Sequence, residues 1–327
     1  MIENRKILIT GGCGFIGTSV AEKLVDSNEI ILYDLNLKNN AFGFSKLVGH
    51  PNVTLVEGDI LDSEKLRECM KDVNIVLHLA AIVGVQNVLH QSLKTLETNF
   101  QGTASVLNSL PDDGIERFVY LSTSEVFGSN AYCVSDNDNS NFGSTDEGRW
   151  CYAISKIASE HLVQAYNREK GLPTVIIRPF NIFGPKRVGD HAILRFIYWA
   201  IHDNQLIIHG NGEAIRSWCY IDDFCDAIIS CLEKPEAIGH SFNIGNSRNT
   251  LTMYELAKRV IQLCNSRSTS IFKAIDYSDV QIRVPNTLGA YRILGYEPKV
   301  EIEEGILRTK AWYEEHFPQM DISFFGE

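Results

Sequence analysis

Tyr152 and Lys156 have the residue types and the spacing of an acid–base pair. The apolar spacing of residues 152–170 predicts a helix, in which side chains four apart share a face with Cβ atoms about 5–6 Å apart. A free phenol has a pKa of about 10, and an ammonium about 5 Å away at an effective dielectric constant of about 20 favours the phenolate by about 3 kcal/mol. The pair therefore predicts that Tyr152 is a general base. The alternative is a surface tyrosine beside a solvated lysine.

A glycine-rich turn follows the first apolar strand, and its spacing is typical of dinucleotide binding. Gly11 allows the tight turn, Gly14 lets a pyrophosphate approach the backbone, and Gly17 lets the next helix pack on the sheet. That helix begins with Phe15 and Ile16, where free N–H groups and the helix dipole favour a negative charge. Taken alone, the motif also fits a strand–turn–helix corner without a ligand.

Asp34 strengthens the interpretation because it ends the second predicted strand, 17 residues after Gly17. A carboxylate there accepts hydrogen bonds from the adenosine ribose hydroxyls and repels the 2′-phosphate of NADP. Asp59 and Ile60 follow the third strand, where the adenine ring would lie. These signals together predict that the cofactor is NAD, whose positive nicotinamide ring would further favour the phenolate of Tyr152.

Strands and helices alternate through the first half of the chain. Predicted strands are Lys6–Thr10, Glu29–Asp34, Val53–Glu57, Asn74–Leu79, Phe118–Ser122 and Thr174–Arg178; predicted helices are Phe15–Ser27, one capped by Asp62 or Ser63, Leu93–Leu110 and 152–170. Such alternation predicts an α/β fold with a doubly wound parallel (Rossmann) sheet. Ligands bind at the carboxyl ends of parallel strands, so Thr123, just after the fifth strand, is expected to face Tyr152 and a sugar hydroxyl.

The second half of the chain is less regular. Residues 129–149 are rich in Ser, Asn, Asp and Gly and lack an apolar period, so we expect a structureless segment that is functional or mobile. We expect residues 1–180, with segments returning near 215–245, to form the NAD-binding domain. Residues 181–327 are expected to form mainly a smaller α/β substrate domain.

The composition narrows the possible partners. The formal net charge is −11, which argues against nucleic acid and means that an anionic substrate must be held by a few Arg and Lys residues. No apolar run approaches the ~20 residues that a membrane span needs. The eight cysteines are scattered without a C-x2-C pair, which predicts reduced thiols, a cytoplasmic protein and no metal site.

Several stretches together resemble the extended short-chain dehydrogenase/reductase family, which includes NAD-dependent nucleotide-sugar epimerases, dehydratases and decarboxylases. They are Thr10–Gly17, His78-Leu79-Ala80-Ala81, Asn99 with Gly102-Thr103, Ser122–Gly128, Tyr152–Lys156, Arg178-Pro179-Phe180-Asn181, Gly184-Pro185, and Arg216 before Tyr220-Ile221-Asp222-Asp223. The resemblance covers nearly the whole chain.

The resemblance implies roles for further residues. Thr123, Tyr152 and Lys156 would be the catalytic trio, with Tyr152 and Lys156 also contacting NAD. Leu79, Ala80 and Ala81 would line the cofactor. Asn181, Arg216 and Arg283 would contact a nucleotide diphosphate, unless these arginines are structural partners of Asp222 or Asp223. Similar proteins form homodimers through the helices near 93–110 and 152–169, which makes a homodimer the expected state.

Ser124, expected at the substrate, and Glu125 bear on the outcome after the shared oxidation of the sugar 4-hydroxyl. Similar 4,6-dehydratases carry Asp-Glu here, and Ser124 is too weak an acid to expel a 6-hydroxyl. Thr-Ser-Glu is similar to UDP-glucuronate decarboxylases and to bacterial 4-epimerases. The longer match, including Arg149-Trp150-Cys151-Tyr152, favours the epimerases. Glu125 either takes part in the chemistry or only orients its neighbours.

The sequence thus predicts an NAD-dependent 4-epimerase of a nucleotide sugar, with a UDP-sugar favoured. Ile182 weakens the case for a uronate, because many of those epimerases have a threonine after the Asn. A UDP-glucuronate decarboxylase is the first alternative and a 4,6-dehydratase the next. A non-catalytic NAD(H) sensor is the alternative from another class.

Overall fold

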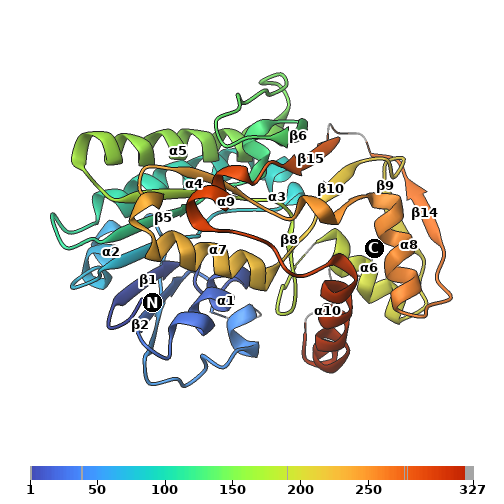
Figure 1. Cartoon of the computed structure of the whole chain (residues 1–327), viewed down its shortest axis with the longest axis horizontal. Helices are drawn as coiled ribbons and strands as arrows, with labels where there is room; N and C mark the ends of the chain where they lie inside the picture. Colours follow the sequence, from blue (N-terminus) through green and yellow to red (C-terminus); the bar gives the residue numbers. More distant parts are fainter. Residues whose placement is uncertain (1, 38–39, 190, 276, 278, 321–327) are drawn as a thin grey trace.

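Seven parallel strands form one sheet in the computed structural model, which describes residues 2–37, 40–189, 191–275, 277 and 279–320 (Figure 1). Their order is β12-β7-β5-β4-β1-β2-β3. The bounds are β1 Lys6–Thr10, β2 Glu29–Asp34, β3 Val53–Glu57, β4 Ile75–His78, β5 Arg117–Leu121, β7 Thr174–Pro179 and β12 Ser241–Ile244. The order reverses between β1 and β4, which confirms the predicted doubly wound Rossmann sheet.

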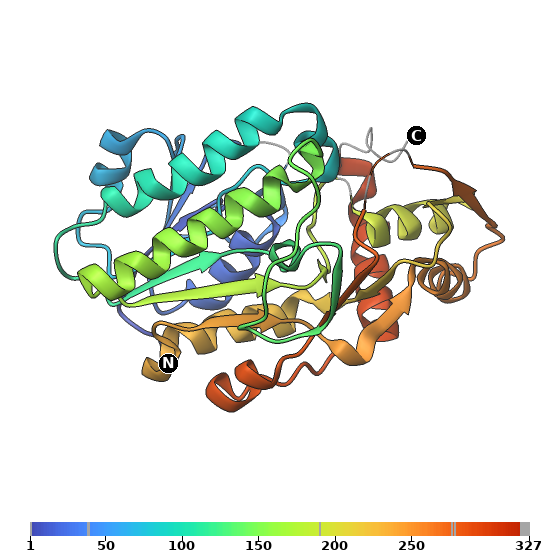
Figure 2. The ribbon, with the colours of Figure 1, turned by 90° about the horizontal axis from the view of Figure 1, so that it is seen from above.

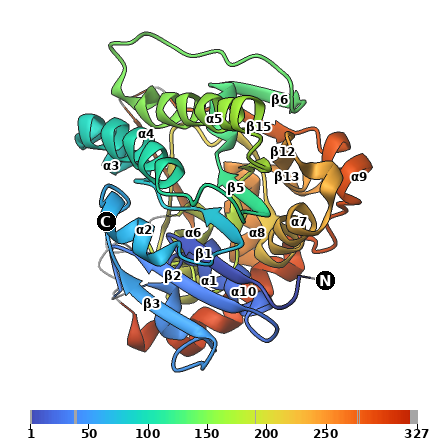
Figure 3. The ribbon, with the colours of Figure 1, turned by 90° about the vertical axis from the view of Figure 1, so that its left-hand side faces the viewer.

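Side chains of the sheet are buried on both faces, because successive residues of a strand point to opposite sides. In β1, Ile7 and Ile9 join one apolar core and Leu8 joins the other. Helices α1 (Phe15–Leu24) and α7 (Ile221–Glu233) cover the first face. Helices α2 (Ser63–Cys69), α4 (Ser92–Asn108) and α5 (Cys151–Lys170) cover the second (Figure 3).

The remaining helices are α3 Val85–His90, α6 Ala192–Ile201, α8 Met253–Leu263, α9 Leu288–Leu294 and α10 Ile302–His316. Figure 2 shows α4 and α5 side by side along the sheet. None of the helices among the described residues has the length and apolar character that crossing a bilayer requires.

A second sheet lies beyond the carboxyl ends of the large one (Figure 1). Its order is β13-β10-β15-β6, with bounds β6 Asn130–Val134, β10 Ile215–Ser217, β13 Thr250–Thr252 and β15 Ile282–Pro285. Two further pairs are β8 Ile182–Phe183 with β11 Cys219–Tyr220, and β9 Leu206–His209 with β14 Ser270–Lys273. The domain boundary near residue 180 stays a prediction, while β12 pairs with β7 within the large sheet.

Two sequence expectations differ from the structure. The segment 129–149 is not structureless throughout, since β6 pairs with β15 about 150 residues away, a contact that no local period reveals. Helix α1 ends at Leu24 rather than Ser27, because the Asn28 side-chain amide donates a hydrogen bond to the Leu24 carbonyl at 2.8 Å. Asp62 is the cap of α2, where its side chain accepts the Lys65 N–H at 3.1 Å.

Candidate active site

The turn between β1 and α1 has no room for side chains at Gly11, Gly12 or Gly17. Gly11 has φ +69°, and a Cβ there would lie 2.8 Å from the Ala80 nitrogen. A Cβ on Gly17 would lie 2.6 Å from the Gly11 oxygen. Gly14 precedes the first turn of α1, whose N–H groups have no described side chain capping them. The turn, with Phe15 and Ile16 at the helix start, therefore fits a pyrophosphate.

Asp34 lies beside this turn. One carboxylate oxygen accepts the Cys13 N–H at 3.0 Å, and the other accepts the Asn36 N–H at 3.0 Å. Burial raises the pKa of Asp34, and the two backbone hydrogen bonds oppose that rise. The carboxylate is thus held at the carboxyl end of β2, where a ribose bound next to the glycine turn would meet it.

The other predicted cofactor residues lie along the same edge of the sheet. The Asp59 carboxylate accepts the Leu61 N–H at 3.0 Å. Ile60 is buried, and a Cβ on Gly102 would lie 2.3 Å from its side chain, so Ile60 serves the core as well.

The loop after β4 closes the edge of the sheet over the turn. The Leu79 N–H donates to the Thr10 carbonyl at 3.0 Å, which continues the β1–β4 ladder. The Ala80 N–H faces the Thr10 hydroxyl at 3.4 Å, and Ala81 follows half-buried. Ala80 is therefore the neighbour that forbids a side chain at Gly11.

Tyr152 and Thr123 meet as the sequence predicts. Thr123 precedes the 3-10 turn Ser124–Phe127, and its hydroxyl accepts the Glu125 N–H at 3.2 Å. Burial raises the pKa of Tyr152 and the charge of Glu125 raises it further, while a hydrogen bond with Thr123 and the charges of Arg283 and Arg149 lower it. The protein groups by themselves therefore make the phenol harder to ionise than a free tyrosine, and the positive charge of a nicotinamide ring would oppose this effect.

Lys156 has a partner that its spacing does not predict. Its ammonium donates to the Leu121 carbonyl at 2.7 Å and lies 4.8 Å from the centre of the Tyr120 ring. Burial lowers the pKa of Lys156 to about 7, against an opposing effect of Glu160. The side chain is thus anchored at the end of β5, and an effect of its charge on the pKa of Tyr152 stays a prediction.

Asn99 of α4 ties the helix of the catalytic residues to the cofactor edge. Its amide donates to the Ser155 hydroxyl at 3.2 Å, and its oxygen accepts the Ile82 N–H at 2.8 Å. Ser155 lies between Tyr152 and Lys156 in the sequence. The resemblance included Asn99 but implied no role for it.

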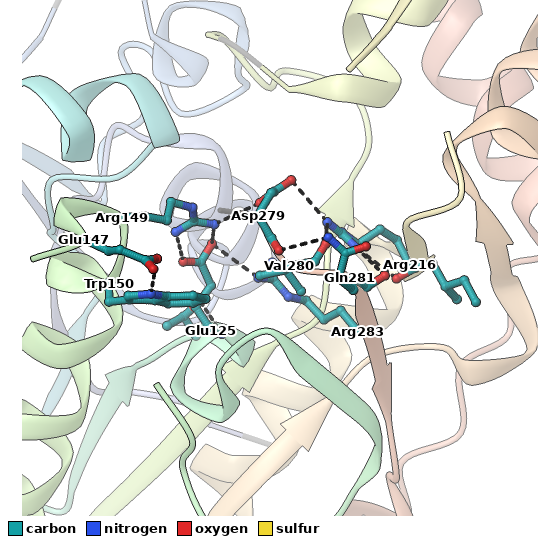
Figure 4. Close-up of polar contacts among 11 residues, drawn as sticks. Glu125, Glu147, Arg149, Trp150, Arg216, Asp279, Val280, Gln281 and Arg283 are labelled. Carbon is teal, nitrogen blue, oxygen red and sulfur yellow. Dashed lines mark hydrogen bonds and ion pairs between the residues drawn. The ribbon is translucent and has the colours of Figure 1, made fainter. Parts of the chain in front are cut away.

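Five charged side chains form what we call the arginine cluster: Arg149, Arg216, Arg283, Glu125 and Asp279 (Figure 4). Arg149 grips Glu125 with two hydrogen bonds of 2.6 and 3.2 Å. Arg283 approaches the same carboxylate at 3.4 Å. Asp279 lies between Arg149 and Arg216, at 3.4 Å from the first and 3.5 Å from the second.

The cluster is a positive site in an acidic protein, with three cations against two anions. Burial by itself would raise the pKa of Glu125, but the charges of Arg283, Arg149 and Arg216 hold it below its ordinary value. Glu125 is therefore an anion near neutral pH. The arrangement agrees with the expectation that a chain of net charge −11 binds an anionic substrate through a few arginines.

Arg216 and Arg283 are register partners in β10 and β15, yet their hydrogen bonding differs. Arg216 donates to the carbonyls of Ile215 at 3.0 Å and Gln281 at 3.3 Å, and to that of Val280. Arg283 Nη2 lies 3.4 Å from Glu125 in an ion pair, whereas its buried Nε has no hydrogen-bond acceptor among the described residues. The Nε donor therefore stays open to an oxyanion.

The structural alternative for the two arginines named Asp222 and Asp223 as partners. Asp222 instead lies 3.6 Å from Arg308, and the Asp223 carboxylate accepts the backbone N–H groups of Lys299 and Val300 at 2.9 and 3.0 Å. That pairing is wrong for both arginines.

Asn181, Ser124 and Ile182 complete the predicted substrate side. The Asn181 amide donates to the Ser217 carbonyl at 2.8 Å, which links it to the end of β10. Ser124 is buried beside Thr123. Ile182 packs in the main apolar core, so its lack of a hydroxyl removes nothing from the arginine cluster.

A cavity of about 630 Å³ adjoins the arginine cluster, with Trp150, Glu147, Asp279 and Gln281 in its lining. This volume is in the usual range of small-molecule sites. Sequence reasoning missed Arg149 and Asp279 as site residues. The only feature of the sequence that pointed to Arg149 as a site residue is its place three residues before Tyr152. No feature of the sequence pointed to Asp279.

The model of the NAD dependent epimerase/dehydratase family matches residues 7–245. The chain belongs to this family. It is therefore an NAD-dependent enzyme rather than a non-catalytic sensor.

Relatives in this family catalyse different net reactions. The chain is 32% identical over 321 residues to UDP-N-acetyl-alpha-D-glucosaminuronate decarboxylase of Bacillus cytotoxicus, covering 95% of this chain and 98% of the relative. It is 32% identical over 325 residues to dTDP-D-glucose 4,6-dehydratase of Mus musculus, covering 96% and 90%. The structure of UDP-glucuronic acid 4-epimerase from Bacillus cereus, in complex with UDP-glucuronic acid and NAD, has a TM-score of 0.87 at 25% identity and covers 95% and 99%.

Proposed function

We propose that this enzyme oxidises the 4-hydroxyl of a UDP-linked sugar acid and then releases its carboxyl group as carbon dioxide. The observation that carries the proposal is the buried Nε donor of Arg283, which has no hydrogen-bond acceptor among the described residues. Buried donors without acceptors are costly, at about 1–3 kcal/mol each, and call for a ligand. Arg283 contacts Glu125 and influences the pKa of Tyr152, so an oxyanion held there lies at the reacting end of the sugar.

The first step uses the residues around Thr123. Thr123 hydrogen-bonds the sugar hydroxyl, and Tyr152 takes its proton. NAD, when bound at the glycine turn, supplies the acceptor for the hydride from carbon 4. Arg216 in β10 and Asn181, which is bonded to the end of β10, contact the diphosphate. Asp34 holds the adenosine ribose, and Lys156 stays fixed at the end of β5 next to the cofactor edge.

The second step follows from the chemistry of the ketone. A 4-keto uronate is a β-keto acid, so the bond from carbon 5 to the carboxyl carbon breaks and its electron pair moves into an enolate. Tyr152 carries the proton that it took in the first step and donates a hydrogen bond to that enolate oxygen, which stabilises the developing charge. A proton from the solvent then enters at carbon 5, the hydride returns to carbon 4, and Tyr152 gives its proton back to the 4-oxygen. Arg283 orients the carboxylate before it leaves.

The 4-epimerase favoured by the sequence is the second candidate. Its support is the stretch from Ser122 to Gly128, the Arg149-Trp150-Cys151-Tyr152 match and the similarity to the 4-epimerase of Bacillus cereus. A dehydratase would need an acid at Ser124, which is a buried hydroxyl.

Product analysis tests the assignment. The NAD-loaded enzyme is incubated with UDP-glucuronate, UDP-N-acetylglucosaminuronate and the matching neutral UDP-hexoses, and the products are followed by mass spectrometry and carbon dioxide release. We expect a uronate to yield carbon dioxide and a UDP-sugar lighter by that mass. A product of unchanged mass with an inverted carbon 4 would replace decarboxylation by epimerisation. Loss of water would identify a dehydratase.

We also propose a homodimer through α4 and α5. The support is the exposure of Leu93, Phe100 and Ile154 on these two adjacent helices. Light scattering after gel filtration should give twice the chain mass, and Phe100→Glu should give the monomer. A monomeric wild-type protein would rule this interface out.

A further inference from the structure

Two buried ion pairs hold helix α5, and both have two-point geometry. Near its start, Arg149 binds Glu125 at 2.6 and 3.2 Å. Further along, Glu160 of the helix binds Arg178 of β7 at 2.9 and 2.6 Å. The side chains are 4% and 13% exposed in the first pair and 12% and 10% in the second. The pairs are alike in geometry and burial and differ in what they connect.

The first pair joins the two segments that carry the reacting groups. Arg149 lies three residues before Tyr152, in the 3-10 turn Gly148–Trp150 that leads into α5. Glu125 lies two residues after Thr123 and donates its backbone N–H to the Thr123 hydroxyl at 3.2 Å. The guanidinium thus connects the loop of the hydrogen-bonding threonine to the helix of the base (Figure 4).

We infer that Arg149 is a positioning residue: its two-point grip on Glu125 sets the distance between Thr123 and Tyr152, and it contacts neither the sugar nor the cofactor. The planar guanidinium fixes both the place and the plane of the carboxylate, which a lysine ammonium cannot do. A misplacement of about 1 Å in reacting groups costs about 100-fold in rate, so such a grip matters for turnover. The inference rests on the proposed role of Tyr152 but not on the fate of the 4-keto sugar.

The same contact keeps Glu125 ionised. The charged and titratable groups around this carboxylate are Arg149 before α5, Arg283 of β15, Arg216 of β10, Asp279 and Tyr152. Because burial raises the pKa of Glu125 and the three arginines lower it, losing Arg149 shifts the balance toward the protonated acid. A protonated Glu125 offers a weaker acceptor to the remaining arginines.

The Arg178–Glu160 pair provides the matched control. The variants are Arg149→Lys, Arg149→Met, Arg178→Lys and Arg178→Met in the NAD-loaded enzyme. Single-turnover formation of NADH from the accepted UDP-sugar is measured together with KM, kcat and Tm. Both pairs should lower Tm when broken. Only the Arg149 variants should lower the rate of NADH formation, by about 10- to 100-fold with KM little changed.

The lysine variant separates geometry from charge. The pKa of the Glu125 carboxylate is followed by NMR with isotope-labelled glutamate and assigned with Glu125→Gln. It should rise in Arg149→Met, return toward the wild-type value in Arg149→Lys, and stay unchanged in both Arg178 variants. The rate should stay low in Arg149→Lys, because one ammonium does not fix the carboxylate plane.

Equal effects of the two ion pairs on the rate would overturn the inference and leave Arg149 with a purely structural role, as would a wild-type rate in Arg149→Lys. A wild-type enzyme that forms no NADH with any nucleotide sugar would instead overturn the proposed function. In that event the NMR titration alone decides, and equal pKa responses to the loss of Arg149 and of Arg178 would overturn the positioning role.

Discussion

The glycine turn and the arginine cluster lie at the same edge of the large sheet but are built in different ways. The turn is one continuous stretch, Thr10–Gly17, whose backbone geometry follows from its own residues. The cluster takes side chains from residue 125, from the turn before α5, from β10 and from the segment around β15. The turn presents backbone N–H groups, whereas the cluster presents buried charges that depend on one another.

The difference shows how each site tolerates change. At the glycine turn, an added atom meets backbone, as at Gly11 against Ala80, so geometry limits substitution. In the cluster, removing one charge changes the balance among buried groups that share partners, which is destabilising. We therefore expect substitutions at the cofactor end to act by steric exclusion. Substitutions at the substrate end should act by upsetting the balance of charges.

Loss of the base should produce the largest effect. Tyr152→Phe keeps the ring but removes the proton acceptor, so NADH formation should fall by about 10²- to 10⁴-fold. The nucleotide sugar should still raise the Tm of the variant, because binding lies with other residues. Near-normal turnover would move the base elsewhere in the site.

Substitutions of the two register-paired arginines should differ in their effect on the binding of charged and neutral UDP-sugars. Arg283→Met removes the charge and the open Nε donor, and we expect a UDP-uronate to bind about 10- to 100-fold more weakly, with little change for the neutral UDP-hexose. Arg216→Met should weaken both sugars by a similar factor, because its contacts tie the backbone of β10 to that near β15. Titration calorimetry with both sugars measures the ratio. Equal losses in Arg283→Met would assign this arginine to the diphosphate, as the sequence resemblance implied.

A change at the cofactor end should be smaller and confined to cofactor choice. Asp34→Asn removes the charge that repels a 2′-phosphate, so the preference for NAD over NADP should narrow by about tenfold. Asp59→Asn serves as the control, because the adenine end is the same in both cofactors. Direct titration with each dinucleotide provides the ratio, and equal binding of NAD and NADP by the wild type would contradict the placement of Asp34.

The smallest effect expected is on stability and depends on pH. Burial lowers the pKa of Lys156 to about 7 from its ordinary 10.5, so below pH 7 the folded chain carries the full cost of a buried ammonium. That cost fades as pH rises from about 7 toward 10.5, where the unfolded chain also loses its proton. Lys156→Met should therefore raise Tm by a few °C at pH 6 and by less at pH 9. A difference in Tm that is constant with pH would show that the lysine is charged throughout.

Local sequence was enough to predict the cofactor-binding end of the site. The glycine spacing, Asp34 at the end of a strand and the alternation of strands and helices predicted the sheet and its carboxyl edge, because each depends on neighbours in the chain. The same reasoning left out β6, since its pairing partner β15 lies far along the chain. The four-residue spacing of Lys156 from Tyr152 likewise says nothing about the Leu121 carbonyl to which Lys156 donates.

By itself, then, the sequence determined the Rossmann sheet, the dinucleotide turn and the pairing of Thr123 with Tyr152. Only the tertiary structure decided that Arg216 is bonded to backbone carbonyls, that Arg283 has an open Nε donor among the described residues, and that Arg149 binds Glu125. The reason is physical. Backbone turns and apolar periods are properties of short segments, whereas the pKa and the free hydrogen-bonding capacity of a buried charge depend on groups that the fold brings together from distant parts of the chain.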